Sequence, residues 1–161
     1  MLEGCRGAKK VADLFAGSGP FSIRLAETAE VHAVESDRHA LAALDRAARA
    51  TPGLRRITTE VRDLFRRPLL KPELDRFDAV VLDPPRAGAE AQCRQLILSS
   101  LDTVIMVSCD PGTFGRDAAI LTSAGFAPAR IVPVDQFAWS SHIEIAAIFR
   151  RKRTGAGRRR R

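Results

Sequence analysis

The chain has 161 residues, of which 45% are apolar and 28% charged, and its formal net charge is +7. This length allows one domain with a substantial core, and no apolar run approaches the ~20 residues that a membrane-spanning helix needs. The start of the sequence, MLEGCRGAKKVADLF, has no long apolar stretch of the kind that a secretory leader carries before its cleavage site. Three scattered cysteines exclude a disulfide framework, and no Cys/His spacing indicates a zinc site, so a reducing, cytoplasmic compartment is expected.

Apolar runs alternate with amphipathic stretches along the chain. The predicted strands cover Val11–Phe15, Val31–Glu35, Arg56–Thr59, Asp78–Leu82, Thr103–Ser108, about Ala129–Asp135, and Ile143–Arg150. One predicted helix follows the first strand and ends at Ala26, and the others cover Arg38–Ala50, Ala89–Ser100 and Thr113–Ala124. Nearly continuous apolar strands indicate a doubly wound α/β domain with a mostly parallel sheet and ligands at the carboxyl ends of the strands. The last two strands leave no room for a crossover helix and should form an antiparallel hairpin.

A glycine-rich turn follows the first predicted strand. The segment from Asp13 to Phe21 reads DLFAGSGPF, and Glu35 closes the second strand 16 residues after Gly19. Such a turn lets a ligand approach the backbone, and an acid at this place accepts hydrogen bonds from ribose hydroxyls. The third glycine of a dinucleotide fingerprint and the lysine of a P-loop are both missing. We therefore expect a nucleoside cofactor, with a plain strand–helix connection as the alternative.

Two more acids follow predicted strands. Asp63, in VRDLF, could contact an adenine edge or cap a helix. Asp83 precedes Pro84 and Pro85, which remove two backbone donors and hold the carboxylate rigidly at the ligand-bearing edge. A ligand-facing acid is favoured at this position over a simple proline turn.

Cys109 ends the fifth predicted strand in the segment SCDP, and Glu144 opens the last strand in HIE. A cysteine at such a strand end is a candidate nucleophile, although most free cysteines are inert buried thiols, as Cys5 and Cys93 are expected to be. An antiparallel last strand would bring Glu144 to the same edge as Cys109. There its carboxylate could act as a general base. The alternative is a solvated acid, which is the commoner fate of a lone glutamate on an edge strand.

The positive charge is concentrated at the end of the chain. Eight of the 26 Lys and Arg residues lie in RRKRTGAGRRRR, so that residues 1–149 sum to −1. We therefore expect a catalytic or binding domain over residues 1–150 and a basic, disordered tail over residues 151–161. Such a tail attracts polyanions without sequence preference, or has no role.

Six segments, in this order, resemble the catalytic domain of S-adenosylmethionine-dependent RNA uridine-C5 methyltransferases. They are DLFAGSGPF, VHAVE, the aspartate of VRDLF, LDPPRAG, VSCDPGTFGRD and DQFAWSSHIE, and the resemblance spans residues 9–150. The combination of LDPPR, SCDP and HIE is specific, whereas the glycine-rich turn marks only the wider methyltransferase class. The resemblance implies a seven-stranded class I methyltransferase sheet, S-adenosyl-L-methionine as cofactor, rRNA or tRNA as partner, and no metal.

The resemblance also implies a role for each site residue. The cofactor loop is implied to be shaped by Asp13, Phe15, Gly17, Gly19 and Pro20. Glu35 would hold the ribose, Asp63 would lie at the adenine, and Asp83 would lie near the methionine end and the target base. Cys109 would add to C6 of the uracil, which makes C5 nucleophilic, and Glu144 would accept the C5 proton after methyl transfer.

Several features depart from the family pattern. Pro20 stands where asparagine is frequent, and Asp110 stands where the family often has asparagine. Family enzymes carry an N-terminal RNA-binding domain, so we expect this chain to be a fragment of a longer enzyme or a stand-alone remnant. Two other functions stay open: methylation of an exocyclic amine, which leaves Cys109 and Glu144 without roles, and an inactive module that binds RNA through its arginine tail.

Overall fold

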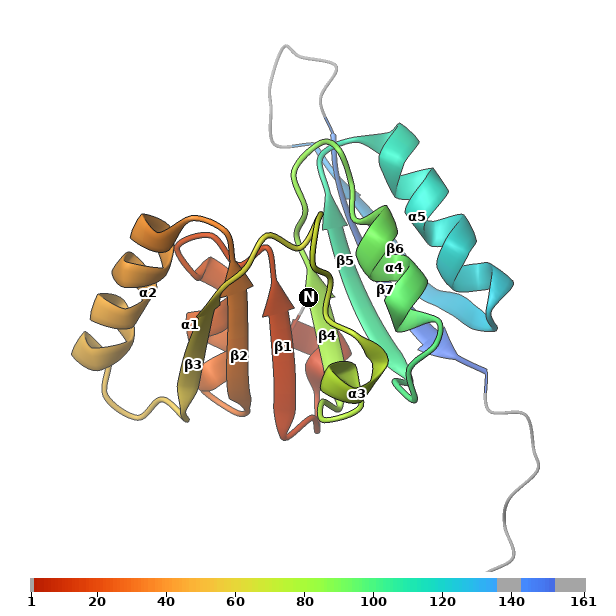
Figure 1. Ribbon diagram of the computed structural model, residues 1–161. Coiled ribbons are helices and arrows are strands. Elements are labelled where there is room, and N and C mark those ends of the chain that lie inside the picture. The colour runs from red at the N-terminus through yellow and green to blue at the C-terminus, as the bar shows by residue number, and fades with distance from the viewer. Residues whose placement is uncertain (1, 136–142, 153–161) are drawn as a thin grey trace, which may run out of the picture.

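The computed structural model describes residues 2–135 and 143–152. Within these ranges, seven strands form one sheet in the order β3-β2-β1-β4-β5-β7-β6 (Figure 1). They are β1 (Lys10–Leu14), β2 (Glu30–Glu35), β3 (Ile57–Val61), β4 (Ala79–Leu82), β5 (Thr103–Ser108), β6 (Phe126–Val134) and β7 (Glu144–Arg151). Neighbours among β1 to β5 pair in parallel, whereas β7 runs antiparallel to both β5 and β6. The predicted doubly wound sheet and its C-terminal antiparallel hairpin are confirmed.

Different helices cover the two faces of the sheet. The helical elements are η1 (Leu2–Cys5), α1 (Pro20–Ala26), α2 (Arg38–Ala50), α3 (Lys71–Leu74), α4 (Glu90–Leu96) and α5 (Pro111–Ser123). One core joins α3, α4 and α5 to side chains such as Leu82, Met106 and Phe149. The other face packs on α1 and η1 around Val31 and Ile105, and on α2 around Ala33. Apolar strands buried on both faces explain why alternation is absent from their sequences.

The ends of two helices show where the local sequence determines the helix bounds and where it does not. The predicted range Arg38–Ala50 matches α2, because Asp37 caps it by accepting hydrogen bonds from the N–H groups of His39 and Ala40 at 2.7 and 3.3 Å. The predicted helix over Ala89–Ser100 is too long, since α4 ends at Leu96. There the Ser99 hydroxyl donates to the Leu96 carbonyl at 2.7 Å, and this closes the last turn.

The boundary of the basic tail differs by one residue from the prediction. Arg151 belongs to β7, and its guanidinium donates to the carbonyl of Leu101 at 3.0 Å and lies 4.2 Å from the ring centre of Phe126. Arg150 donates to the carbonyl of Gly4 at 3.0 Å. Both arginines therefore serve the fold, and the rest of the predicted tail, residues 153–161, lies outside the described residues.

Candidate active site

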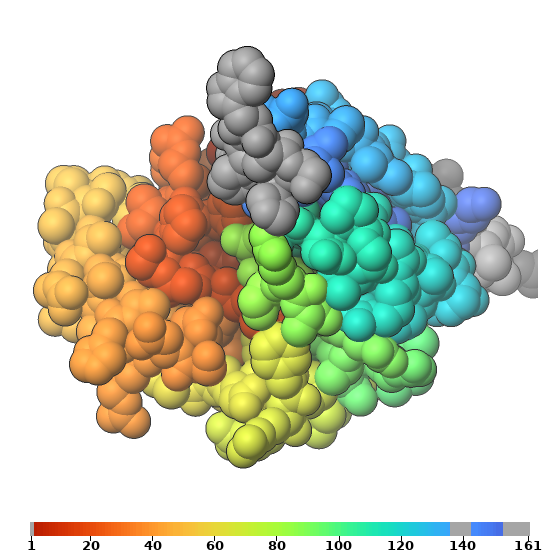
Figure 2. Space-filling view, turned by 90° about the horizontal axis from the view of Figure 1, so that it is seen from above, coloured from red at the N-terminus to blue at the C-terminus, as the bar shows by residue number. Residues whose placement is uncertain are grey.

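The carboxyl ends of β1, β2, β4 and β5 meet at one edge of the sheet, at the top of Figure 1. Seen from above, the segments that follow β1, β4 and β5 come together at the centre of this edge (Figure 2). The strand order reverses here, because β1 leads outward to β2 on one side and β4 lies on its other side. Ligands of open α/β sheets bind at such a switch point, so this edge is the candidate active site.

The loop after β1 is held from below by Asp13. This side chain is fully buried, and its Oδ2 accepts a hydrogen bond from the Ser22 hydroxyl at 2.5 Å, whereas Oδ1 has no partner among the described residues. Asp13 thus ties the end of β1 to α1. Gly19 has a φ of 83°, and a Cβ there would lie 2.3 Å from Leu44, so only glycine fits where the loop passes α2. Pro20 then begins α1 at a position where no N–H is needed.

Asp13 makes folding stability depend on pH. Burial raises the pKa of Asp13 to about 7, whereas an aspartate in an unfolded chain titrates near ~4. Between these values the folded state binds the proton and the unfolded state does not, so stability falls as pH rises from about 4 to 7 and is level above that. The Asp13→Asn variant should lose this slope, which is at most about 1.4 kcal/mol per pH unit.

The measurement is the urea unfolding midpoint of both proteins between pH 5 and 8. The exposed Asp102 gives the matched control, Asp102→Asn, which reports the effect of removing a surface carboxylate. Curves for wild type and Asp13→Asn that run parallel over this range would contradict the titration assigned to Asp13.

Glu35 organises the loops at the end of β2. Its Oε2 accepts from the N–H of Gly17 at 3.0 Å, and its Oε1 accepts from the N–H groups of Ser36 and Asp37 at 2.6 and 3.0 Å. Burial acts to raise the pKa of Glu35, but the hydrogen bonds from Asp37, Gly17 and Ser36 outweigh it and lower the pKa below its ordinary value. Glu35 is therefore an anion that holds Gly17 in place through a hydrogen bond. Gly17 has a positive φ, and the space where a Cβ would project is open.

A hollow of about 400 Å³ lies beside Glu35. Four of the predicted site residues line it: Phe15, Glu35, Asp63 and Asp83. Phe15, which has a φ of 63°, packs its ring 5.4 Å from that of Phe65, centre to centre. The hollow thus combines aromatic walls with carboxylates, and it suits a ligand that has both a flat ring and hydroxyl groups.

The alternative interpretation of Asp63 as a helix cap is wrong, because no helix begins directly after this residue. Its Oδ1 accepts from the N–H groups of Phe65 and Arg66 at 2.9 and 3.3 Å, in a turn and not at a helix start. The same residue lines the hollow, so its hydrogen bonds within the turn are compatible with contact to a ligand. Sequence reasoning missed Phe65, and its only signal was an apolar residue in the charged stretch RDLFRR.

Asp83 follows β4, Cys109 follows β5 and Glu144 begins β7, and these three strands are neighbours in the sheet. Burial and the nearby negative charge of Glu144 raise the pKa of Asp83 to about 6. The last register pair between β5 and β7 is Ser108 with Ile145, so Cys109 and Glu144 stand opposite each other one residue further on. Strand alternation from Val81 to Asp83, and along β5 and β7, carries all three side chains to the same face. Cys109 is partly exposed there.

The loop after Asp83 is fastened to α5. The buried Asp117 carboxylate accepts from the N–H of Ala89 at 2.6 Å, Arg116 donates to the carbonyl of Ala87 at 2.9 Å, and the Thr113 hydroxyl donates to the carbonyl of Arg86 at 3.0 Å. A Cβ on Gly88 would lie 2.4 Å from Arg116. These contacts tie the loop that follows Asp83 to the helix that follows Cys109. No local pattern in the sequence indicated this contact.

Other predicted features fall outside the site. Cys5 and Cys93 are buried as expected, and burial raises the pKa of Cys5 to about 11. Within the described ranges, no three His, Cys, Asp or Glu side chains group as metal ligands, and no helix is long and apolar enough to cross a bilayer. Most of the segment DQFAWSSHIE, including His142, lies outside the described residues.

Comparisons with known proteins agree on one family. A family model described as tRNA (uracil-5-)-methyltransferase matches residues 5–152. An RNA methyltransferase of Agrobacterium fabrum is 54% identical over 148 residues, which cover 92% of this chain and 36% of that protein. The 23S rRNA (uracil(1939)-C(5))-methyltransferase of Chromohalobacter salexigens is 40% identical over 141 residues, or 86% of this chain and 29% of that protein.

The solved structures give the same fold. The tRNA (uracil-54, C5)-methyltransferase of Pyrococcus abyssi, crystallised with S-adenosyl-L-homocysteine, superposes with a TM-score of 0.76 at 29% identity and covers 88% of this chain and 34% of that one. Magnesium protoporphyrin IX methyltransferase from Synechocystis, at 19% identity and a TM-score of 0.68, shares the fold alone. The sheet is therefore of the class I methyltransferase type, and the chain spans about a third of the length of the curated relatives it matches.

Proposed function

Because the chain belongs to the tRNA (uracil-5-)-methyltransferase family, we propose that its carboxyl edge transfers a methyl group from S-adenosyl-L-methionine to C5 of a uridine in RNA. The partner is rRNA or tRNA, the substrates of the relatives named above. Residues 2–152 form the methyl-transfer domain of this enzyme. One observation carries the proposal: the β5–β7 register that sets Cys109 opposite Glu144 beside Asp83.

The hollow beside Glu35 fits the cofactor in size and chemistry. Phe15 and Phe65 offer ring faces for an adenine, and the anionic Glu35 keeps acceptor capacity toward ribose hydroxyls. Gly17 leaves space where a Cβ would stand, as a close approach of ligand to backbone requires. Asp83 would lie toward the methionine end, and Asp63 toward the adenine. When bound, the cofactor supplies an electrophilic methyl group on a sulfonium.

Cys109 and Glu144 would act in sequence on the uracil ring. Addition of the Cys109 thiolate to C6 breaks the C5–C6 double bond and makes C5 a nucleophile. After C5 has taken the methyl group, Glu144 accepts the C5 proton, the double bond re-forms, and the thiolate leaves C6. The loop fastening by Thr113, Arg116 and Asp117 holds Asp83 and the segment after Cys109 in fixed relation through both steps.

The cofactor assignment predicts a binding defect in Glu35→Ala. Loss of the carboxylate leaves ribose hydroxyls unpaired and frees the N–H of Gly17, so cofactor binding should weaken by about 1–3 kcal/mol, which is roughly 5- to 150-fold in Kd. Isothermal calorimetry with S-adenosyl-L-homocysteine measures this. The exposed Glu27, which pairs with Arg24, gives the control Glu27→Ala. Equal affinity of Glu35→Ala and wild type would refute the assignment.

Covalent capture tests the reaction itself. RNA that carries 5-fluorouridine cannot lose its C5 substituent as a proton, so the adduct to Cys109 should persist after methyl transfer. The enzyme expressed from its complete gene, incubated with this RNA and cofactor, should give a denaturation-resistant complex whose peptide map contains Cys109. An enzyme that methylates RNA without forming such a complex would instead be an exocyclic amine methyltransferase.

A further inference from the structure

A second hollow lies at the opposite edge of the sheet from the candidate active site. It holds about 390 Å³ and is formed where β1, β2 and β3 begin, on the face that α3, α4 and α5 share. In Figure 1 the lower parts of these three strands face the viewer with no described helix in front of them. We refer to this hollow as the amino-edge groove. The comparisons and the proposed methyl transfer give it no role.

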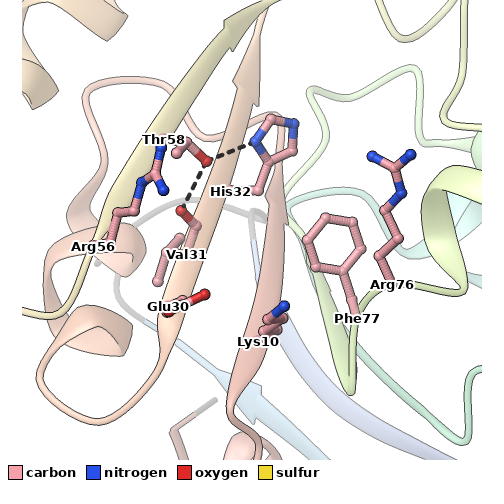
Figure 3. Close-up of a pocket in the computed structure, with 8 residues that line it drawn as sticks. All are labelled: Lys10, Glu30, Val31, His32, Arg56, Thr58, Arg76 and Phe77. Carbon is pink, nitrogen blue, oxygen red and sulfur yellow. Dashed lines mark hydrogen bonds between the residues drawn. The ribbon is translucent and has the colours of Figure 1, made fainter.

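Three cations surround the amino-edge groove. Lys10 rises from the start of β1, Arg56 precedes β3, and Arg76 precedes β4 (Figure 3). All three are exposed, and none forms an ion pair with any residue in the ranges 2–135 and 143–152. Glu30 is the single acid among the residues that line it. The groove is thus a site of net positive charge in a domain whose residues 1–149 sum to −1.

The walls of the groove are rigid and partly aromatic. The rings of His32 and Phe77 lie 5.9 Å apart at an angle of 14°. One ring nitrogen of His32 contacts the Thr58 hydroxyl at 2.9 Å (Figure 3), and the other contacts Glu60 at 3.1 Å, so hydrogen bonds hold the ring on both sides. Phe77 is half-buried and stands between Arg76 and His32. Cations beside a fixed aromatic surface are the usual means of holding a nucleic-acid strand.

The positive charge continues along the same edge. A neighbouring hollow of about 330 Å³ is lined by Arg6, Lys9 and Arg150. Asp78 is the acid in the lining of this second hollow, and its carboxylate accepts hydrogen bonds from the N–H groups of Lys9 and Lys10 at 2.8 and 3.0 Å. β7 also ends here, because Arg150 pairs with Thr103 at the start of β5. Arg6, Lys9 and Arg150 therefore extend the positive charge of the groove along this edge of the sheet.

We propose that the amino-edge groove binds the phosphodiester backbone of the RNA substrate, as a second contact remote from the reacting uridine. Strands of 4–6 residues separate the two edges, a distance of about 13–20 Å. A short RNA stem reaches across that distance, so one molecule can present a uridine to Cys109 and phosphates to Lys10, Arg56 and Arg76. This inference rests on the proposed function in one respect, which is that the polyanion bound in the groove is RNA.

The first test is the salt dependence of RNA binding. Each phosphate contact contributes about 0.7–0.9 to the slope of log K against log salt, so Arg56→Gln combined with Arg76→Gln should lower the slope by about 1.5. The matched control is Arg46→Gln combined with Arg49→Gln, which removes the same charge from the exposed side of α2. Fluorescence anisotropy with a labelled RNA hairpin, in the full chain, gives the slopes. Equal slopes for the two double variants would overturn the proposal.

A second test needs no variant. RNA should protect the Lys10 amine from acylation, read by mass spectrometry, whereas inorganic phosphate at the same phosphate concentration should not. Protection by inorganic phosphate equal to that by RNA, or by polyglutamate in place of RNA, would overturn the proposal in favour of a free anion or an acidic peptide. In the complete enzyme, the groove variant should raise KM for RNA and leave kcat unchanged. RNA binding at the groove by an enzyme that fails the fluorouridine test would refute the proposed function alone.

Discussion

Cys109→Ala is expected to abolish methylation of RNA while cofactor binding persists. Without the thiolate, C6 is never attacked and C5 stays too weak a nucleophile to take a methyl group. Removal of a covalent nucleophile lowers turnover by roughly 10⁴- to 10⁶-fold, so the variant should fall below detection in an assay of labelled methyl transfer. The hollow beside Glu35 does not include Cys109, so the Kd for S-adenosyl-L-homocysteine should match that of wild type.

Cys5→Ala is the matched control, because it removes a buried thiol at the end of η1 that does not line the hollow beside Glu35. It should retain turnover. No covalent complex with 5-fluorouridine RNA should form with Cys109→Ala, whereas Cys5→Ala should form it as wild type does. Methylation by Cys109→Ala at a rate near that of wild type would refute the nucleophile and favour an amine substrate.

Sequence pattern predicted the central sheet well because β1, β4 and β5 are buried on both faces. Continuous apolar runs such as Thr103–Ser108 gave strand bounds that the structure reproduces, and a single capping residue, Asp37, fixed the start of α2. The helix α3 was missed, since its four residues, Lys71–Leu74, are too few to show helical periodicity. The prediction ended the last strand one residue early, before Arg151, because the partners of Arg151, such as Phe126, are brought to it by the pairing of β6 with β7 and not by neighbours in sequence.

In the candidate site, too, some features could be predicted from the sequence and others could not. Residues at strand ends could be predicted, since parallel topology alone brings Glu35, Asp83 and Cys109 to one edge. The full burial of Asp13 could not be predicted, because its contact with Ser22 depends on how α1 folds back over β1. Nor could the fastening of Ala89 by Asp117, since 28 residues separate the two and the contact depends on the angle between α4 and α5. The position of these residues at the strand ends was predictable, and the contacts that support them were not.

Glu144→Gln should fail at a later step than Cys109→Ala. The glutamine keeps the size of the side chain but cannot accept a proton, so thiolate addition and methyl transfer proceed and loss of the C5 proton stalls. Turnover should fall by about 10²- to 10⁴-fold, the usual contribution of a general base. A methylated RNA–protein complex should accumulate, visible on a denaturing gel as a shifted band that carries label from the methyl group. Cys109→Ala gives no such band.

The charge of Glu144 also has an effect on the pKa of Asp83 that can be measured without RNA. Its proximity contributes to the raised pKa of Asp83, about 6, and burial is the larger cause. Glu144→Gln should therefore lower the pKa of Asp83 part of the way toward its ordinary value, as carboxyl NMR of the chain can measure, whereas the exposed Glu27→Gln should leave it unchanged. If Glu144→Gln shifts Asp83 but turns over RNA normally, Glu144 lies in the site without acting as the base. If it traps the labelled complex, the proton from C5 leaves through this carboxylate.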